Sequence, residues 1–165
     1  MTTPSKPRTP AGRLAGGCYM ARIRSLAVAL ALLSAPVAAD GHRMLTIHLA
    51  SSHLGADGFN EENPGIGLRL GRGDWYGAVG FYKNSLSRNS VYAGAGRTLG
   101  RIGPLAFNLN GGMVTGYSVP VAPFLSPEVV LDFGRARVIL SYVPKVTIED
   151  TTTEHALALS IGVPF

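Results

Sequence analysis

The chain has 165 residues, of which 46% are hydrophobic and 15% are charged, and its formal net charge is +5. The whole excess comes from five basic residues before residue 40, because the ten basic and ten acidic residues from Asp40 onward cancel. This distribution gives no reason to expect a nucleic-acid partner. The single cysteine, Cys18, lies in the same prefix, so the rest of the chain has neither a disulfide nor a cysteine nucleophile.

Residues 1–39 are predicted to be a leader that contains a secretory signal peptide. Arg22 and Arg24 precede the apolar run SLAVALALLSAPV, and Val37-Ala38-Ala39 offers small residues for cleavage before Asp40. The apolar run is shorter than the ~20 residues of a spanning helix, which disfavours the alternative of a retained anchor. Met20 is a candidate for the true start, and residues 40–165 are the predicted mature domain.

The mature part alternates apolar with small or polar residues and is broken at short intervals by Gly, Pro, Asn and Asp. In HALALSIGVPF, for example, Leu157, Leu159 and Ile161 fall on one face, and Ala158 and Ser160 fall on the other. This period of two predicts strands. The eight expected strands cover about 43–53, 65–71, 75–84, 89–98, 104–115, 119–131, 135–144 and 155–165.

The predicted fold is all-β, an eight-stranded antiparallel transmembrane β-barrel with up-and-down meander topology. Several strands reach the ~9–11 residues of a membrane strand, the chain ends in Phe165, and aromatic residues near the strand ends are candidates for interfacial girdles. A soluble sandwich would alternate in the same way. The low charge and the small, mildly polar residues of the inner face favour the barrel, located in the bacterial outer membrane.

Connectivity predicts which segments meet. With a periplasmic N-terminus, the connections after the odd-numbered strands are extracellular, so the stretch from Ser51 and the stretch from Tyr82 to Ser90 share one rim. His53 ends the first strand and Ser85 ends the third, and a histidine base can activate a hydroxyl. A solvated loop without chemistry is the alternative.

The segment between the first two strands is expected to close this rim. Asn60, Glu61 and Glu62 are expected to hydrogen-bond across the mouth or hold a bridging cation, and Pro64 and Gly65 to turn the chain into the second strand.

Small residues on the inner face suggest a slot in the lumen, suited to a hydrocarbon chain; tight packing around His48, Asn108 and Tyr92 is the alternative. The candidate lining residues are Ala50, Ala78, Gly80, Gly94, Gly96 and Ala158. The four histidines lack metal-ligand spacing, and the glycine-rich GAGRTLG and GRGDWYG open no helix. No metal and no cofactor are therefore expected.

Two stretches resemble the lipid A palmitoyltransferase (PagP) family: FNEENPGIGLRLGRGDWYGAVGFYKNSLSRNSVYAGAG and YSVPVAPFLSPEVVLDFGRARVILSYVPK. The resemblance covers roughly residues 44–165. Its most specific pieces are Asn60-Glu61, Trp75-Tyr76-Gly77, Lys83-Asn84-Ser85, residues 119–127 and Tyr142-Val143-Pro144.

The resemblance implies an outer-membrane enzyme that moves a palmitoyl-like chain from a phospholipid to lipid A, with the chain held in the lumen. It also implies that prolines weaken strand pairing and admit lipid from the side, since proline lacks the ladder donor. The residues concerned are Pro120, Pro123, Pro127 and Pro144.

The family's catalytic residues are a histidine on the first strand and an Asp-Ser pair that ends the third. Ser85 matches the serine, but Asn84 stands at the aspartate position, and an amide can orient a group without acting as a carboxylate. His53 fits the rim, and His48, which faces the lumen, is the alternative base.

The expected function is acyl transfer between a phospholipid donor and a lipid A acceptor, by a monomer in the outer-membrane bilayer. Two alternatives stay open. One is a non-catalytic structural or lipid-binding barrel. The other is a lipid A deacylase or phospholipase, in which Ser85 is the nucleophile and Glu61 or Glu62 orients the histidine.

Overall fold

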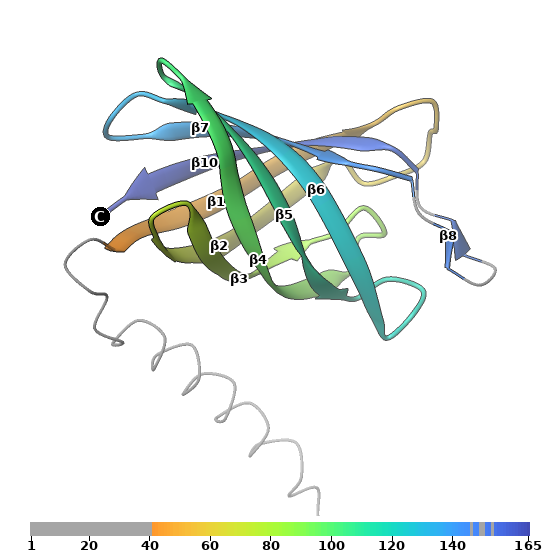
Figure 1. The fold of residues 1–165 in the computed structure, drawn as a ribbon. Helices are drawn as coiled ribbons and strands as arrows, with labels where there is room; N and C mark the ends of the chain where they lie inside the picture. Colours follow the sequence, from red (N-terminus) through yellow and green to blue (C-terminus); the bar gives the residue numbers. More distant parts are fainter. Residues whose placement is uncertain (1–40, 146, 149–150, 153) are drawn as a thin grey trace, which may run out of the picture. The chain divides into compact units, whose positions relative to one another are not determined.

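The computed structural model describes residues 41–145, 147–148, 151–152 and 154–165 (Figure 1). The predicted leader, residues 1–39, lies outside the described residues. The strands are β1 (Gly41–His53), β2 (Glu62–Arg72), β3 (Trp75–Lys83), β4 (Asn89–Ile102), β5 (Leu105–Thr115), β6 (Val121–Asp132), β7 (Arg137–Val143), β8 (Thr147–Ile148), β9 (Thr151–Thr152) and β10 (Ala156–Pro164). In this part of the chain, no helix is long and apolar enough to span a bilayer.

Eight of these strands form one closed antiparallel barrel in the order β1-β10-β7-β6-β5-β4-β3-β2, which confirms the predicted meander. The short strands β8 and β9 pair with each other in the connection from β7 to β10 and were not predicted. Gly73, Gly103 and Gly134 adopt positive φ in the three short turns, a conformation that glycine reaches without a steric penalty. The short turns share one end of the barrel with the start of β1 and the C-terminus (Figure 1).

The outer wall carries the apolar half of the alternation. Large apolar side chains are exposed on every strand of the barrel, and examples are Ile47, Ile66, Phe81, Val91, Met113, Leu125, Leu140 and Leu159. Water would disfavour such a surface, whereas the hydrocarbon core of a bilayer covers it. Trp75 and Phe81 face outward as expected of a girdle, but Tyr82, Tyr92 and Phe124 lie on the inner face and contact one another or His48.

An irregularity in β1 changes which side chains face the lumen. His48 pairs with Ser160, but Ala50 pairs with the outward-facing Leu159, so Leu49 is an extra residue in β1. Directly paired residues share a face, so Ser51 (opposite Ala158) and His53 (opposite Ala156) point inward. Strict alternation from His48 would have placed them outside.

The same irregularity accommodates a proline in β2. His48 pairs with Gly65 and Ala50 pairs with Glu62, so Asn63 and Pro64 lie opposite Leu49, where the ladder is interrupted. Proline is tolerated at such bulges because it has no N–H to donate. The expectation that Pro64 and Gly65 form a turn before the second strand is therefore wrong: β2 already begins at Glu62.

The lumen is filled at the end with the short turns and hollow at the other. Met44, Ala106, Val130 and the fully buried Ile139 form an apolar cluster near the turns. Above it, the Arg69 guanidinium on β2 crosses to Glu128 on β6 with two hydrogen bonds of 2.7 and 2.8 Å. This buried ion pair forms the floor of the open half.

Candidate active site

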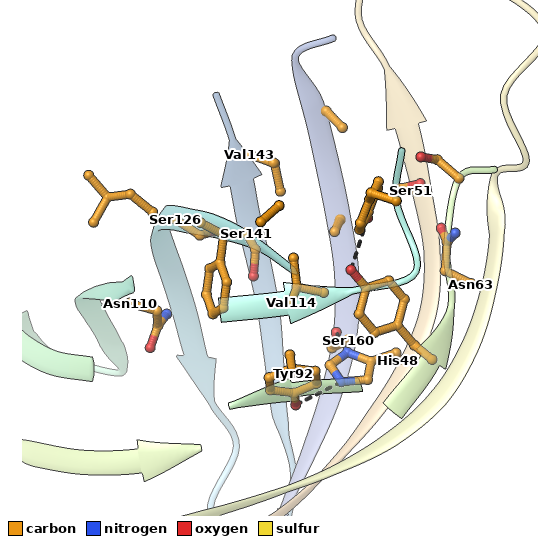
Figure 2. A pocket seen from close by; sticks show the side chains of 18 of the residues that line it. His48, Ser51, Asn63, Tyr92, Asn110, Val114, Ser126, Ser141, Val143 and Ser160 are labelled. Atoms are coloured by element: carbon orange, nitrogen blue, oxygen red, sulfur yellow. Dashed lines mark hydrogen bonds between the residues drawn. The ribbon is translucent and has the colours of Figure 1, made fainter. Parts of the chain in front are cut away.

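A cavity of about 280 Å³ occupies the lumen between the ion pair and the long loops. This is close to the lower bound of small-molecule sites, about 300 Å³. Its floor includes His48, Arg69, Tyr92, Asn110 and Glu128, and its walls include Val114, Ala122, Phe124 and Ala158. Figure 2 shows His48, Tyr92 and Ser160 gathered on one side, and Asn110 and Val114 coming from another wall.

The first two long loops are tied together at the mouth, as predicted from connectivity. The Asn60 backbone N–H donates to the Ser85 carbonyl at 2.8 Å, and the Asn60 amide donates to the Asn84 carbonyl at 3.1 Å. Asn63 donates to the Lys83 carbonyl at 3.0 Å. These bonds hold the end of β3 against the start of β2 and so fix Ser85 at the edge of the cavity.

The irregularity in β1 makes the His53 side chain point inward, so that it borders the cavity. Its ring stacks on Phe59 with centroids 4.3 Å apart, and its backbone N–H donates to the Glu61 carboxylate at 3.2 Å. Nδ1 of His53 is buried and has no hydrogen-bond partner among the described residues. The imidazole is thus oriented from one side and keeps a nitrogen available.

His48 lies deeper and is bonded at both nitrogens. Nδ1 lies 3.0 Å from the Ser160 hydroxyl and Nε2 lies 3.0 Å from the Tyr92 hydroxyl, so the ring joins β1 to β10 and β4 (Figure 2). Both nitrogens are engaged in the lumen wall, which gives His48 a clear packing role.

Ser85 and Asn84 are adjacent but occupy different surroundings. Ser85 borders the cavity together with His53 and Tyr117, and no hydrogen bond joins Ser85 to His53 within the described part of the chain. The Asn84 side chain is 0% exposed and lies outside the cavity lining. Its amide oxygen accepts from the backbone N–H groups of Leu86 and Arg88, both at 2.9 Å, and its amide nitrogen donates to Ser90 Oγ and to the Gly116 carbonyl. Asn84 therefore shapes the loop that presents Ser85.

Replacing Asn84 with aspartate is expected to destabilise this loop. A carboxylate would lose the donor to the Gly116 carbonyl, 2.8 Å away, and would place two oxygens against each other in a buried site. An unsatisfied buried polar group costs about 1–3 kcal/mol, and a charged one costs more. Urea unfolding of N84D measures this loss, and Asn84→Ser is an uncharged control. Unfolding of N84D at the same urea concentration as the wild type would contradict this role of the Asn84 amide.

The barrel wall is incompletely paired on one side of the cavity. β6 pairs with β7 only from Glu128 (opposite Ser141) to Asp132 (opposite Arg137), although β6 begins at Val121. The ladder stops next to Pro127, which cannot donate, and Pro123 and Pro144 border the cavity at this gap. In Figure 1, β6 runs away from β7 and β10 toward the loop end. Pro120 precedes β6 in the loop that follows β5.

The predicted small residues divide into two groups. Ala78, Gly94 and Ala158 line the cavity. Ala50 borders it at the irregularity, although it pairs with the outward-facing Leu159. Gly80 and Gly96 also face inward, but their space is filled, since a Cβ would lie 2.7 Å from the Tyr92 ring and 2.3 Å from the Tyr76 ring, respectively. These two glycines make room for tyrosines below the cavity.

Sequence reasoning missed the Arg69–Glu128 pair and its partners. Tyr76 lies against Arg69 and donates to Asn110, and Ser141 donates to Glu128 at 3.0 Å. The signal was present: Arg69 and Glu128 are charged residues on the inner face of apolar strands, and a charge buried there requires a partner. Tyr82 and Tyr117, whose hydroxyls lie 2.9 Å apart near the mouth, carried no comparable signal.

No family model matches the chain, and no curated protein matches it. Solved barrels do. A designed transmembrane β-barrel is similar over 79% of this chain and 100% of its own, with a TM-score of 0.58 and 12% identity. The Yersinia pestis outer membrane protein Ail is similar over 76% of this chain and 99% of its own, with a TM-score of 0.51 and 14% identity. At such identities the likeness concerns the fold.

The protein has the fold of an eight-stranded transmembrane β-barrel. The closed sheet, the apolar outer wall and the match in length to a designed transmembrane barrel and to Ail agree on this fold.

Proposed function

We propose that this barrel is an acyltransferase that moves a fatty acyl chain from a phospholipid to lipid A or a related lipid. His53 takes the proton from the acceptor hydroxyl as its oxygen attacks the ester carbonyl of the phospholipid, and it returns a proton to the lysophospholipid alcohol that leaves when the donor ester breaks. Ser85 binds the reacting ester at the mouth, and Asn84 holds the loop in which Ser85 lies. The donor's acyl chain occupies the cavity below them.

The observation that carries the proposal is the position of His53. It borders a lumenal cavity that Ser85 also borders, and its buried Nδ1 lacks a partner among the described residues. A structural histidine is expected to have its nitrogens bonded, as His48 does.

The unpaired stretch between β6 and β7 supports entry of the acyl chain from the side. An acyl chain that enters there leaves the bilayer without crossing the polar loops. Pro123 and Pro127 keep this stretch of β6 from completing its ladder, and Pro144 ends β7.

The test is mass spectrometry of lipid A and phospholipids from cells with and without the protein. Lipid A that gains one acyl chain, with matching lysophospholipid, supports the proposal. Loss of acyl chains from lipid A, or lysophospholipid alone, would indicate a hydrolase. Unchanged lipids, with the protein recovered as a heat-modifiable outer-membrane barrel, would indicate a non-catalytic barrel.

Enlarging Ala158 is expected to shorten the acyl chain that the enzyme prefers. Ala158→Leu places about three more carbon atoms in the cavity wall, and a packed lumen has little room to absorb them. The expected shift is about three methylene groups, measured by mass spectrometry of products from a mixture of donors. Gly94 is unsuitable for this test because a Cβ there would lie 2.4 Å from the Gly111 carbonyl oxygen.

Ala93→Leu provides the matched control, because Ala93 pairs with Val79 and Met113 on the lipid-facing side of β4. The same chain preference in folded, active A158L and in wild type would show that Ala158 does not limit the length.

A further inference from the structure

The charges of residues 40–165 balance, but they are unevenly distributed along the barrel. Among the described residues, the end with the short turns carries Arg43, Arg72, Arg97, Arg101, Arg135 and Arg137 against Asp74 and Asp132. The loop end carries Lys83, Arg88 and Lys145 against Asp57, Glu61, Glu62 and Glu154. The turn end is therefore basic, and a bilayer surrounds it.

Part of this basic charge faces the lipid beside an aromatic ring. Trp75 pairs directly with Arg97 and is 60% exposed on the outer wall. The Arg97 guanidinium carbon lies 5.4 Å from the centre of the Trp75 ring. Arg72 on β2 pairs with Trp75 from its other side and lies on the same outward face. Arg43 also faces outward, but it lies on β1, two strands from Trp75. Tryptophan and arginine in this position mark the level at which the hydrocarbon core gives way to headgroups.

Neither Arg43 nor Arg97 has an acidic partner within the described residues. The ion pairs in that part of the chain include Arg69–Glu128, Arg137–Asp132 and Lys145–Glu154, none of which involves Arg43 or Arg97. The nearest acidic residue along the chain from Trp75 is Asp74, whose backbone carbonyl accepts from Thr98. Arginine binds phosphate oxygens with paired N–H groups, and each basic residue near a membrane surface attracts anionic lipid.

We propose that Arg97 and Trp75 form a binding site on the outer wall for the headgroup of an anionic glycerophospholipid. The Arg97 guanidinium binds the phosphate and Trp75 packs against the glycerol region. This site lies at the opposite end of the barrel from the cavity, and it does not depend on the proposed transferase activity.

Trp75 is the only tryptophan in the chain, so its fluorescence reports on this site. The full chain, purified from outer membranes, is reconstituted in phosphatidylcholine vesicles that contain brominated phosphatidylglycerol or brominated phosphatidylcholine. Quenching gives the relative association constants of the two lipids. We expect phosphatidylglycerol to be favoured by about fivefold, and the preference to weaken as salt is raised from about 0.05 to 0.5 M, because charges near the surface are screened.

Arg97→Gln is expected to reduce the preference to about half or less while the barrel remains heat-modifiable. Arg135→Gln is the matched control, because Arg135 lies in the turn between β6 and β7 at the same end, on the other side of the barrel. Equal association of both lipids with the wild type would overturn the proposal. Equal reductions of the phosphatidylglycerol preference in R97Q and R135Q would also overturn it. They would indicate a general attraction of anionic lipid to the basic end of the barrel and not a site at Arg97.

Discussion

Replacing His53 with alanine is expected to abolish acyl transfer and leave the barrel folded. The imidazole stacks on Phe59 at the mouth and makes no side-chain hydrogen bond to the barrel wall in the described structure, so little stability depends on it. Loss of a general base lowers rates by about 10²–10⁴-fold. Ser85→Ala is expected to have an effect of the same order, because Ser85 is the hydroxyl on the facing loop.

The measurement is transfer of a labelled acyl chain from phospholipid to lipid A by reconstituted variants, with heat-modifiable mobility as the test of folding. His155→Ala is the matched control, since His155 also lies at the loop end but bonds to the Tyr142 hydroxyl at 2.6 Å. His48→Ala is expected to lower stability and keep transfer, because it removes two lumenal hydrogen bonds. Full activity in H53A, together with a folded but inactive H48A, would assign the base to His48.

Removing the carboxylate of Glu128 is expected to have the largest effect on stability. Glu128→Ala would leave the Arg69 guanidinium buried and take an acceptor from Ser141. Breaking a buried ion pair by removing one partner costs about 3–5 kcal/mol in the free energy of unfolding. Urea unfolding in lipid vesicles, followed by Trp75 fluorescence, measures this loss.

The double variant Arg69→Met/Glu128→Leu tests whether stability requires the ion pair itself or only requires that neither charge is left buried without a partner. Apolar replacement of both partners of a buried ion pair is often neutral or stabilising, so the double variant is expected to recover most of the loss. If E128A unfolds at the same urea concentration as the wild type, the guanidinium must find another partner or water, and the proposed floor of the cavity is not rigid.

Alternation and connectivity were enough to predict the barrel and the meeting of its first two long loops. These features follow from the period of the strands and from the rule that successive antiparallel strands reverse direction. The role of Asn84 was beyond such reasoning, because Leu86, Arg88 and Ser90 follow it closely in the chain but the Gly116 carbonyl comes from the loop after β5. The floor of the cavity was missed for the same reason, since Arg69 and Glu128 lie on strands that are not neighbours.

Because Leu49 is an extra residue in β1, the even-numbered side chains face the lumen before it and the odd-numbered side chains face the lumen after it. Thr46 and His48, before this residue, point into the lumen. Ser51 and His53, after it, also point into the lumen, although they have odd numbers. The counterpart of His53 in a related barrel therefore has to be located by its distance from this offset, because an alignment counted from the end with the short turns would place a lipid-facing residue in its position. Pro64, which lies opposite Leu49 in the next strand, gives a second marker for the same boundary.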